Sequence, residues 1–338
     1  MTDLGLHLEP HTSGNRDNFF QLGNTAWDRH DHAEQDDPEW PTSLKGMKPK
    51  DVRYWNQKRM DWLLANSKLV FTPHMEIAHN QLRKSLLLRG EQSPECFGLR
   101  GERFVGKTSI IERYVYDYHC KMTGERPNDN GEDIPHVPVV WLQTSKTTKQ
   151  IAESLFEFYG YQPPKGNEGT LIREARRHAR LHRTEIMVLD DVHNLKGKNS
   201  AMDLKNLYEN LGSVMFIFTR THAQCDAFDT KTGGYQTLDR TVWQRIDPPE
   251  VSEDEWAELV GTFEWSMPWF HTNEEGLLLD HADLVHEITE GRTGKLAFLM
   301  KHLTFELVER SRGGEDEITA DLLKSINMTG VDHDVRYA

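Results

Sequence analysis

The sequence is poor in the residues that mark secreted, metal-binding and membrane-spanning chains. It has only three cysteines among 338 residues, at positions 96, 120 and 225, too far apart for a metal-ligand motif. A sparse, odd number of cysteines is typical of a reducing compartment. No apolar run approaches the roughly 18 residues that cross a bilayer, and the first residues are polar rather than signal-like. We therefore expect a soluble, cytoplasmic protein with no membrane partner.

Basic residues are also in deficit, but only at one end of the chain. The formal net charge is −14, from 40 Lys and Arg against 54 Asp and Glu. Residues 246–338 hold 21 acidic and 7 basic side chains, which accounts for the whole deficit, and the preceding 245 residues hold 33 of each sign. The acidic total therefore does not exclude nucleic acid as a partner of the first part.

The most informative motif is GERFVGKT at residues 101–108, which fits the phosphate-binding loop pattern G-x-x-x-x-G-K-[ST]. Residues 96–99 before it predict a buried strand, and residues 109–122 after it predict a helix. In such loops the backbone N–H groups surround the phosphates, the lysine (Lys107) reaches the β- and γ-phosphates, and the following hydroxyl (Thr108) binds Mg²⁺. ATP and Mg²⁺ are the predicted cofactors. The predicted nucleotide contacts are Gly101, Glu102, Arg103, Phe104, Val105, Gly106, Lys107, Thr108 and Ser109.

A second motif, IMVLDD at residues 186–191, predicts the catalytic acids. Its four apolar residues are typical of a central parallel strand buried on both faces, whose carboxyl end lies beside the phosphate loop in an open α/β sheet. Asp190 is then placed to hold Mg²⁺, and Asp191 to orient or deprotonate the attacking water. The alternative is a core strand that ends in a turn-forming pair of aspartates.

The remaining pattern predicts an α/β fold followed by a helical region. Further strands are expected at 137–143 and 214–219. Helices are expected at 51–89, after residues 144–149 up to about 159, at 171–183 and at 200–211. This alternation favours a parallel sheet with right-handed crossovers. Helical segments alone follow, at about 252–263, 276–290, 294–311 and 318–326. We predict a flexible N-terminal arm (1–50), a nucleotide-binding α/β domain with leading helices (51–250), a helical lid (251–326) and a tail (327–338).

Five arginines recur at helical spacing between residues 173 and 183, with His178 and His182 between them and Glu174 the one acid among them. Such a stripe is suited to phosphate contacts. The alternative is a solvated helix face whose arginines pair with an acidic neighbouring subunit or lid.

Four short runs give the chain a family resemblance over roughly residues 60–312. They are DDVHNL at 190–195, KLVFTPH at 68–74, the Gln-Arg pair before two prolines at 244–249, and GRTGKL at 291–296. With them the chain resembles the AAA+ ATPases that regulate DNA transposition, the TniB/TnsC group related to the phage MuB protein. The resemblance implies a P-loop AAA+ core with a parallel β-sheet flanked by helices, followed by a small all-helical lid domain.

The resemblance also implies roles for single residues. Thr219, at the end of the 214–218 strand, would sense the γ-phosphate, and Arg245 or Arg240 would be the finger inserted into a neighbouring subunit's site. Arg292 or Lys295 would sense nucleotide from the lid. His193 either reports to the subunit interface or is structural.

Lys121, Lys146 and Lys149 are the predicted contacts to the backbone of double-stranded DNA, with solvated lysines as the alternative. Asp191 stands where most AAA+ enzymes have glutamate, so slow ATP hydrolysis is expected.

The function implied is an ATPase that assembles as a ring or helical filament, a hexamer or heptamer, on duplex DNA without sequence preference. That assembly would recruit a transposase or a target-selection protein, and ATP hydrolysis would disassemble it. Two alternatives share the core motifs: a helicase loader or replication initiator, and a signalling or defence scaffold that ATP switches. DNA-dependent assembly distinguishes the first interpretation from the scaffold.

Overall fold

The fold is described from a computed structural model. It describes residues 40–65, 72–88, 96–124, 136–144, 147–195, 200–221, 239–249, 254–270, 276–310 and 316–328. The chain divides into two compact units. The first contains Ile77–Gly101 and Ile110–Arg245, and the second contains the segment up to Glu76, Glu102–Ser109 and the chain from Ile246 onward. In the described part, every helix is too short or too polar to cross a membrane.

The first unit is built on a five-stranded sheet in the order β2-β3-β4-β1-β5. Parallel pairing joins β2 to β3, β3 to β4, and β4 to β1. The strands are β1 (Cys96–Gly101), β2 (Val139–Gln143), β3 (Ile186–Asp190), β4 (Met215–Arg220) and β5 (Thr241–Ile246). Continuous apolar runs form β3 and β4 because both faces of these central strands are covered. The predicted parallel α/β core is confirmed.

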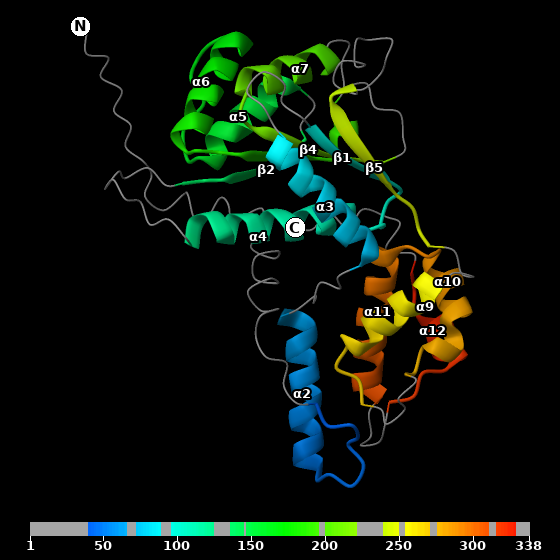
Figure 1. Ribbon diagram of the computed structural model, residues 1–338. Helices are drawn as coiled ribbons and strands as arrows, with labels where there is room; N and C mark the ends of the chain where they lie inside the picture. The colour runs from blue at the N-terminus through cyan, green and yellow to red at the C-terminus, as the bar shows by residue number, and fades with distance from the viewer. Residues whose placement is uncertain are drawn as a thin grey trace, which may run out of the picture. The chain divides into compact units, whose positions relative to one another are not determined.

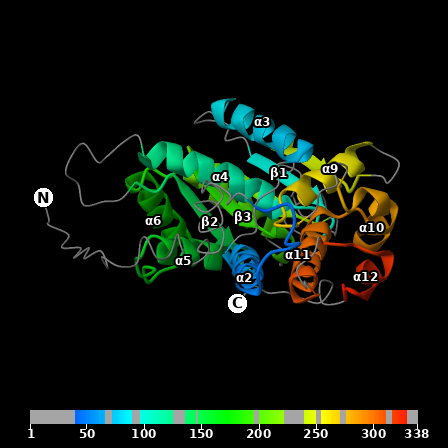
Figure 2. The ribbon, with the colours of Figure 1, turned by 90° about the horizontal axis from the view of Figure 1, so that it is seen from below.

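Helices cover both faces of this sheet (Figure 1). The helices α5 (Thr148–Phe158), α6 (Glu168–Leu181) and α7 (Ser200–Leu211) pack on one face over the main apolar core. The helix α4 (Lys107–Gly124) crosses the other face, beside α3 (Pro73–Leu88), as Figure 2 also shows. His79 of α3 binds the backbone oxygen of Ile110 at 2.8 Å. The carboxyl ends of β1, β3 and β4 therefore share one edge of a sheet that is held on both sides.

The second unit is helical and has its own apolar core. It comprises α2 (Pro49–Ala65), α9 (Asp254–Trp265), a 3₁₀ turn η4 (Leu279–His281), α10 (Ala282–Thr289), α11 (Thr293–Arg310) and α12 (Ala320–Ser325). Its core gathers Trp256, Leu299 and Leu303, all essentially inaccessible to solvent. The predicted all-helical C-terminal region is confirmed, although the segment expected at 276–290 becomes helical only from Leu279. The predicted domain boundaries stay predictions.

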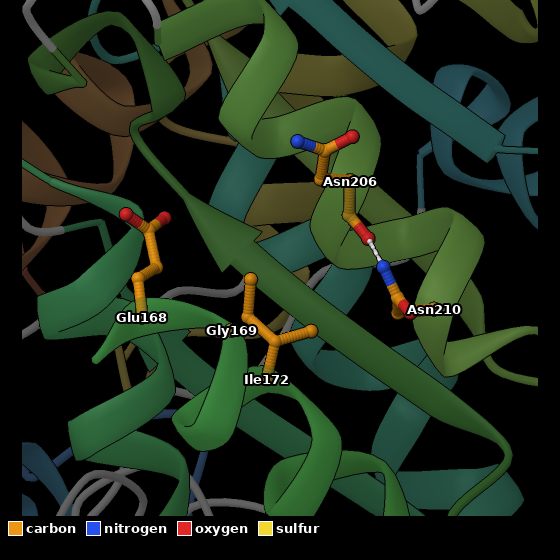
Figure 3. Close-up of a pocket in the computed structure, with 5 residues that line it drawn as sticks. All are labelled: Glu168, Gly169, Ile172, Asn206 and Asn210. Carbon is orange, nitrogen blue, oxygen red and sulfur yellow. Dashed lines mark hydrogen bonds between the residues drawn. The ribbon is translucent and has the colours of Figure 1, made fainter. Parts of the chain in front are cut away.

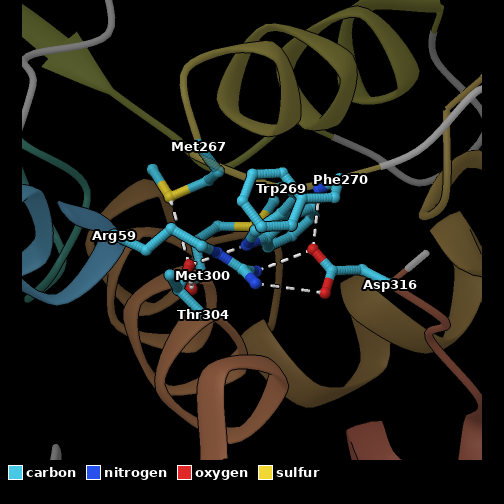
Figure 4. A network of polar contacts seen from close by, with 7 residues as sticks. All are labelled: Arg59, Met267, Trp269, Phe270, Met300, Thr304 and Asp316. Atoms are coloured by element: carbon cyan, nitrogen blue, oxygen red, sulfur yellow. Dashed lines mark hydrogen bonds and ion pairs between the residues drawn. The ribbon is translucent and has the colours of Figure 1, made fainter. Parts of the chain in front are cut away.

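A buried ion pair holds α2 in the second unit (Figure 4). The Arg59 guanidinium, with no exposed surface, donates to both carboxylate oxygens of Asp316, at 3.3 and 2.7 Å. The Phe270 N–H also donates to this carboxylate at 2.7 Å, and the guanidinium lies 4.3 Å from the centre of the Phe270 ring. Burial lowers the pKa of Arg59, and the Asp316 carboxylate opposes that shift. The contact fastens α2 to segments more than two hundred residues away in sequence.

Candidate nucleotide-binding site

A pocket lies between α6 and α7, and its lining contains none of the motif residues (Figure 3). It has a volume of about 320 Å³ and is lined by Glu168, Gly169, Ile172, Asn206 and Asn210. Asn210 donates its side-chain amide to the backbone oxygen of Asn206 at 2.7 Å. Its lining carries one carboxylate and no basic side chain, which is the wrong chemistry for a triphosphate. The candidate nucleotide-binding site therefore lies at the carboxyl ends of the strands rather than in this pocket.

The carboxyl ends of β3 and β4 bring three predicted residues together. Thr219, fully buried, donates its hydroxyl to the Asp190 carboxylate. The same hydroxyl oxygen accepts the backbone N–H of Asp191 at 2.8 Å. This arrangement follows from the parallel pairing, in which Leu189 of β3 lies opposite Phe218 of β4, so both strands end at the same level. One hydroxyl thus fixes the orientation of one aspartate and the backbone of the next.

Asp191 turns the chain away from the sheet. Its φ of 56° and ψ of 46° lie in the left-handed region, and the 3₁₀ turn Val192–Asn194 follows at once. That conformation costs a non-glycine residue about 1 kcal/mol, and Asp is among the residues that tolerate it best. The turn leaves the Asp191 side chain 55% exposed, with its Oδ1 3.6 Å from Nδ1 of His193. The second acid is therefore presented to solvent while the first is held against the sheet.

The phosphate loop, whose residues Glu102–Ser109 belong to the second unit, has a strongly curved backbone. Phe104 and Gly106 both have positive φ, 65° and 85°, so the chain curls between β1 and α4. Successive N–H groups in such a curl form an anion-binding concavity. The Lys107 ammonium, 7% exposed, donates to the backbone oxygen of Glu102 at 2.5 Å, so it folds over the loop. Thr108 is exposed.

The start of α11 contacts this loop within the second unit. The Gly294 N–H donates to the backbone oxygen of Phe104 at 2.6 Å. A Cβ at position 294 would lie 2.8 Å from that oxygen, so the approach requires glycine. The GRTGKL run predicted a lid helix here, and its second glycine is the residue that permits the contact.

Both predicted lid sensors reach an acidic pair beside the loop. Arg292 Nη2 lies 2.8 Å from Glu102 Oε2 and 2.6 Å from Glu290 Oε2. Lys295, 3% exposed, lies 2.7 Å from Glu290 Oε1. Sequence reasoning missed Glu290, and its position directly before GRTGKL was the one available signal. The two acids hold both cations next to the residues expected to bind phosphate.

The two candidate finger arginines lie at opposite ends of β5, a strand that the sequence analysis did not predict. Arg240 is exposed just before β5, where its Nη1 lies 3.1 Å from Glu209 Oε1, and Arg245 is exposed near the strand's other end. Five residues of extended chain separate them by about 17 Å. One neighbouring site therefore cannot accept both arginines. The strand was missed because polar residues interrupt its apolar run, although Ile246 is buried and Trp243 covers Gly98.

The predicted DNA-contact lysines are not brought together. Lys149 lies in the first turn of α5, half-exposed and 3.6 Å from Glu153. Lys121 is exposed in the last turn of α4, a helix about 27 Å long that starts at the phosphate loop. These two lysines are therefore on opposite faces and at opposite edges of the sheet. Lys146 lies outside the described residues.

The structure shows an exposed arginine stripe on α6, but the two histidines between the arginines are not part of it. Arg173, Arg177 and Arg180 are exposed, whereas His178 and His182 are buried beneath them. The rings of His182 and Tyr159 stack with centroids 4.3 Å apart. Burial lowers the pKa of His178 to about 4, with smaller contributions from His182 and Arg177. The histidines belong to the core because they fall on the apolar side of the helix.

Comparison with known proteins agrees with this architecture. A family model described as an AAA domain matches residues 91–226, which include the phosphate loop and the Asp190–Thr219 pair. The match covers less than half of the chain. No curated protein matches the chain. The finer resemblance to the TniB/TnsC group stays a prediction.

Solved structures with an AAA+ P-loop fold match a larger part of this chain than the family model does. The Aeropyrum pernix ORC1 protein in complex with DNA has a TM-score of 0.56 and 16% identity, covering 78% of this chain and 67% of that one. Drosophila ORC bound to DNA has a TM-score of 0.52 and 11% identity, covering 87% and 70%. The Aeropyrum pernix ORC2 protein in its ADP form has a TM-score of 0.50 and 11% identity, covering 74% and 66%. At such identities the likeness concerns the fold alone.

Proposed function

We propose that this chain is an ATPase that binds Mg²⁺ and ATP through its AAA domain and assembles on duplex DNA. The observation that carries the proposal is the Thr219 hydroxyl, which joins Asp190 to the backbone of Asp191 at the end of β3. A core strand that merely ends in a turn-forming pair of aspartates needs no such bridge. A phosphate loop with all its fixed residues falls within the same family match, at residues 91–226.

Each of the predicted site residues has its own role in ATP hydrolysis. Lys107 and the loop N–H groups hold the β- and γ-phosphates, residues 101–109 enclose the nucleotide, and Thr108 with Asp190 supplies hard oxygen ligands of the kind that Mg²⁺ prefers. When bound, Mg²⁺ neutralises charge that develops on the phosphoryl oxygens. Asp191 orients the attacking water, and Thr219 keeps that aspartate's backbone fixed. Because Asp191 is one methylene shorter than glutamate, turnover is slow.

Neighbouring subunits complete the site in this proposal. Arg240 or Arg245 of one copy enters the nucleotide site of the next, which makes hydrolysis depend on assembly into a ring or filament, a hexamer or heptamer. Arg292 and Lys295 exchange their acidic partners for phosphate oxygens when nucleotide binds. Lys121, Lys146 and Lys149 add weak contacts to the DNA backbone, which repeat from copy to copy.

The biological role that we infer is regulation of DNA transposition, with a transposase and a target-selection protein as partners. The DDVHNL and GRTGKL runs support it, as does the similarity of the fold to proteins solved with DNA. The ORC-like fold equally favours a helicase loader or initiator as the second candidate. Asp191 in place of glutamate favours a signalling or defence scaffold in which ATP serves as a switch.

Nucleotide binding and electron microscopy test the proposal in sequence. A fluorescent ATP analogue should bind the full chain with Mg²⁺ and fail to bind the Lys107→Ala variant, while the control Lys324→Ala, an exposed lysine on α12, binds as the parent does. Equal affinity in all three would refute the assignment of the loop.

The second step adds a non-hydrolysable analogue with and without duplex DNA. Rings or filaments that need both ligands support the DNA-dependent regulator. Nucleotide-dependent assemblies that ignore DNA would instead identify the switched scaffold.

A further inference from the structure

The α6 helix presents a strongly basic surface that the nucleotide chemistry does not use. This arginine face consists of Arg173, Arg176, Arg177, Arg180 and Arg183. From position 168 to 183 the chain has five arginines, no lysine and two glutamates. Glu174 lies 3.4 Å from Arg177 and 3.9 Å from Arg173, so one carboxylate is shared by two guanidinium groups. The face keeps a large net positive charge within a chain whose total is −14.

The spacing puts these side chains in two overlapping rows. Positions 173, 177 and 180 follow the i, i+4, i+7 rule, and positions 176 and 180 are one turn apart, whereas Arg183 follows the end of the helix with a φ of 54°. From Arg173 to Arg180 the face extends about 10 Å along the helix axis. Phosphates of one DNA strand follow each other every ~3.4 Å along the duplex axis, so this length matches about three of them.

The opposite side of α6 fixes the face in place. Leu171, Ile172, Ala175 and Ala179 are buried in the core under α5 and α7. Asn167 caps the helix by accepting the N–H of Thr170 at 3.0 Å. Tyr161 packs against the buried His178 with the rings tilted and their centroids 4.5 Å apart. The arginines therefore lie on a rigid support, which lowers the entropy lost when a ligand orders them.

The face has the composition of a phosphate-binding surface rather than of a protein interface. No large apolar side chain of α6 is exposed, so the face lacks the apolar core that protein interfaces bury. Arginine also exceeds lysine in bidentate binding of phosphate oxygens.

We infer that the arginine face of α6 binds the phosphate backbone of duplex DNA. This inference deepens the proposed function and rests on it, because it names the surface through which the assembly holds DNA. It makes α6, rather than the separated Lys121 and Lys149, the principal contact. The interaction is with the backbone and carries no sequence preference.

Fluorescence anisotropy of a labelled 30-base-pair duplex, with Mg²⁺ and a non-hydrolysable ATP analogue, tests the inference across a series of salt concentrations. The test variant is Arg173→Ala/Arg177→Ala/Arg180→Ala. The matched control, Arg53→Ala/Lys58→Ala/Arg83→Ala, removes three exposed cations from α2 and α3. Each lost phosphate contact lowers the slope of log affinity against log salt by about 0.9, so the test variant should lower it by about 2.7.

A second variant, Arg173→Lys/Arg177→Lys/Arg180→Lys, keeps the charges and should keep most of the slope. A thermal melt of each variant checks folding. Alanine on an exposed helix face does not weaken the helix, because alanine has the highest helix propensity. An unchanged slope in the alanine variant would overturn the inference.

The same samples distinguish the other outcomes. If the alanine variant keeps the parent slope but its assemblies become smaller by mass photometry, the face binds the acidic region of a second copy and the inference is wrong. If the parent itself does not bind the duplex, the proposed function fails rather than the choice of surface.

Discussion

Breaking the buried ion pair between α2 and the C-terminal segment should cost the second unit much of its stability. In Arg59→Met the Asp316 carboxylate, whose side chain is 3% exposed, loses the guanidinium and keeps the Phe270 N–H. Removing one partner of a buried pair costs about 3–5 kcal/mol, because the remaining charge stays buried without its counter-ion. For a domain that is stable by about 5–15 kcal/mol, this is a large fraction.

Differential scanning calorimetry of the full chain measures this loss. At 2–4 °C per kcal/mol, the transition of the helical unit should fall by about 10 °C. The control Arg310→Met breaks an exposed pair with Glu306 on α11, worth at most about 1 kcal/mol. If Arg59→Met lowers the transition no more than Arg310→Met does, the reasoning about the buried pair is wrong.

A double variant isolates the electrostatic part of the effect. Arg59→Met/Asp316→Leu removes both charges, so it should recover part of the loss. The recovery stays incomplete because the Phe270 N–H loses its acceptor, at about 1–3 kcal/mol. A double variant as unstable as the single one would mean that packing of the arginine, rather than the unpaired carboxylate, sets the cost.

Three further predictions concern the site and the core. Thr219→Val should slow ATP hydrolysis at least tenfold in a phosphate-release assay without changing nucleotide affinity, because it removes the hydroxyl between Asp190 and Asp191; Thr262→Val, on the exposed side of α9, should change neither. Glu102→Gln should tighten binding of a fluorescent ATP analogue about fivefold, since an exposed charge pair contributes up to ~1 kcal/mol; Glu309→Gln is the control, and unchanged affinity would mean that Glu102 does not compete for Arg292. Because the pKa of His178 is lowered to about 4 from 6.5, its contribution to stability is complete above pH 6.5 and is lost as the pH falls toward 4. Thermal melts between pH 7 and pH 5 should show a loss of on the order of 2 kcal/mol that shrinks in His178→Phe; an equal loss in both would assign it to other groups.

The sequence predicted the sheet well where strands are buried on both faces. The runs that became β3 and β4 are continuously apolar, and no amphipathic helix gives that pattern over so few residues. The strand β5 was missed because it lies at the edge of the sheet, where polar residues interrupt the run. Its pairing depends on Gly98, whose missing side chain makes room for Trp243, and such a fit between distant positions leaves no local signal.

The candidate site likewise contains some residues that the sequence indicated and others that it did not. Lys107 and Asp190 are predicted from their motifs, because phosphate chemistry requires those residue types next to strand ends, whereas Thr219 is expected from the family resemblance; the roles of all three stay predictions. Glu290 was not predicted, because it acts through contacts with Arg292 and Lys295 that depend on how the lid helix folds back within its unit. Glu102 was predicted as a nucleotide contact but not as a partner of Arg292. Motifs therefore predict which groups bind phosphate, whereas the acidic partners of Arg292 and Lys295 are visible only once the loop and the lid residues are seen together.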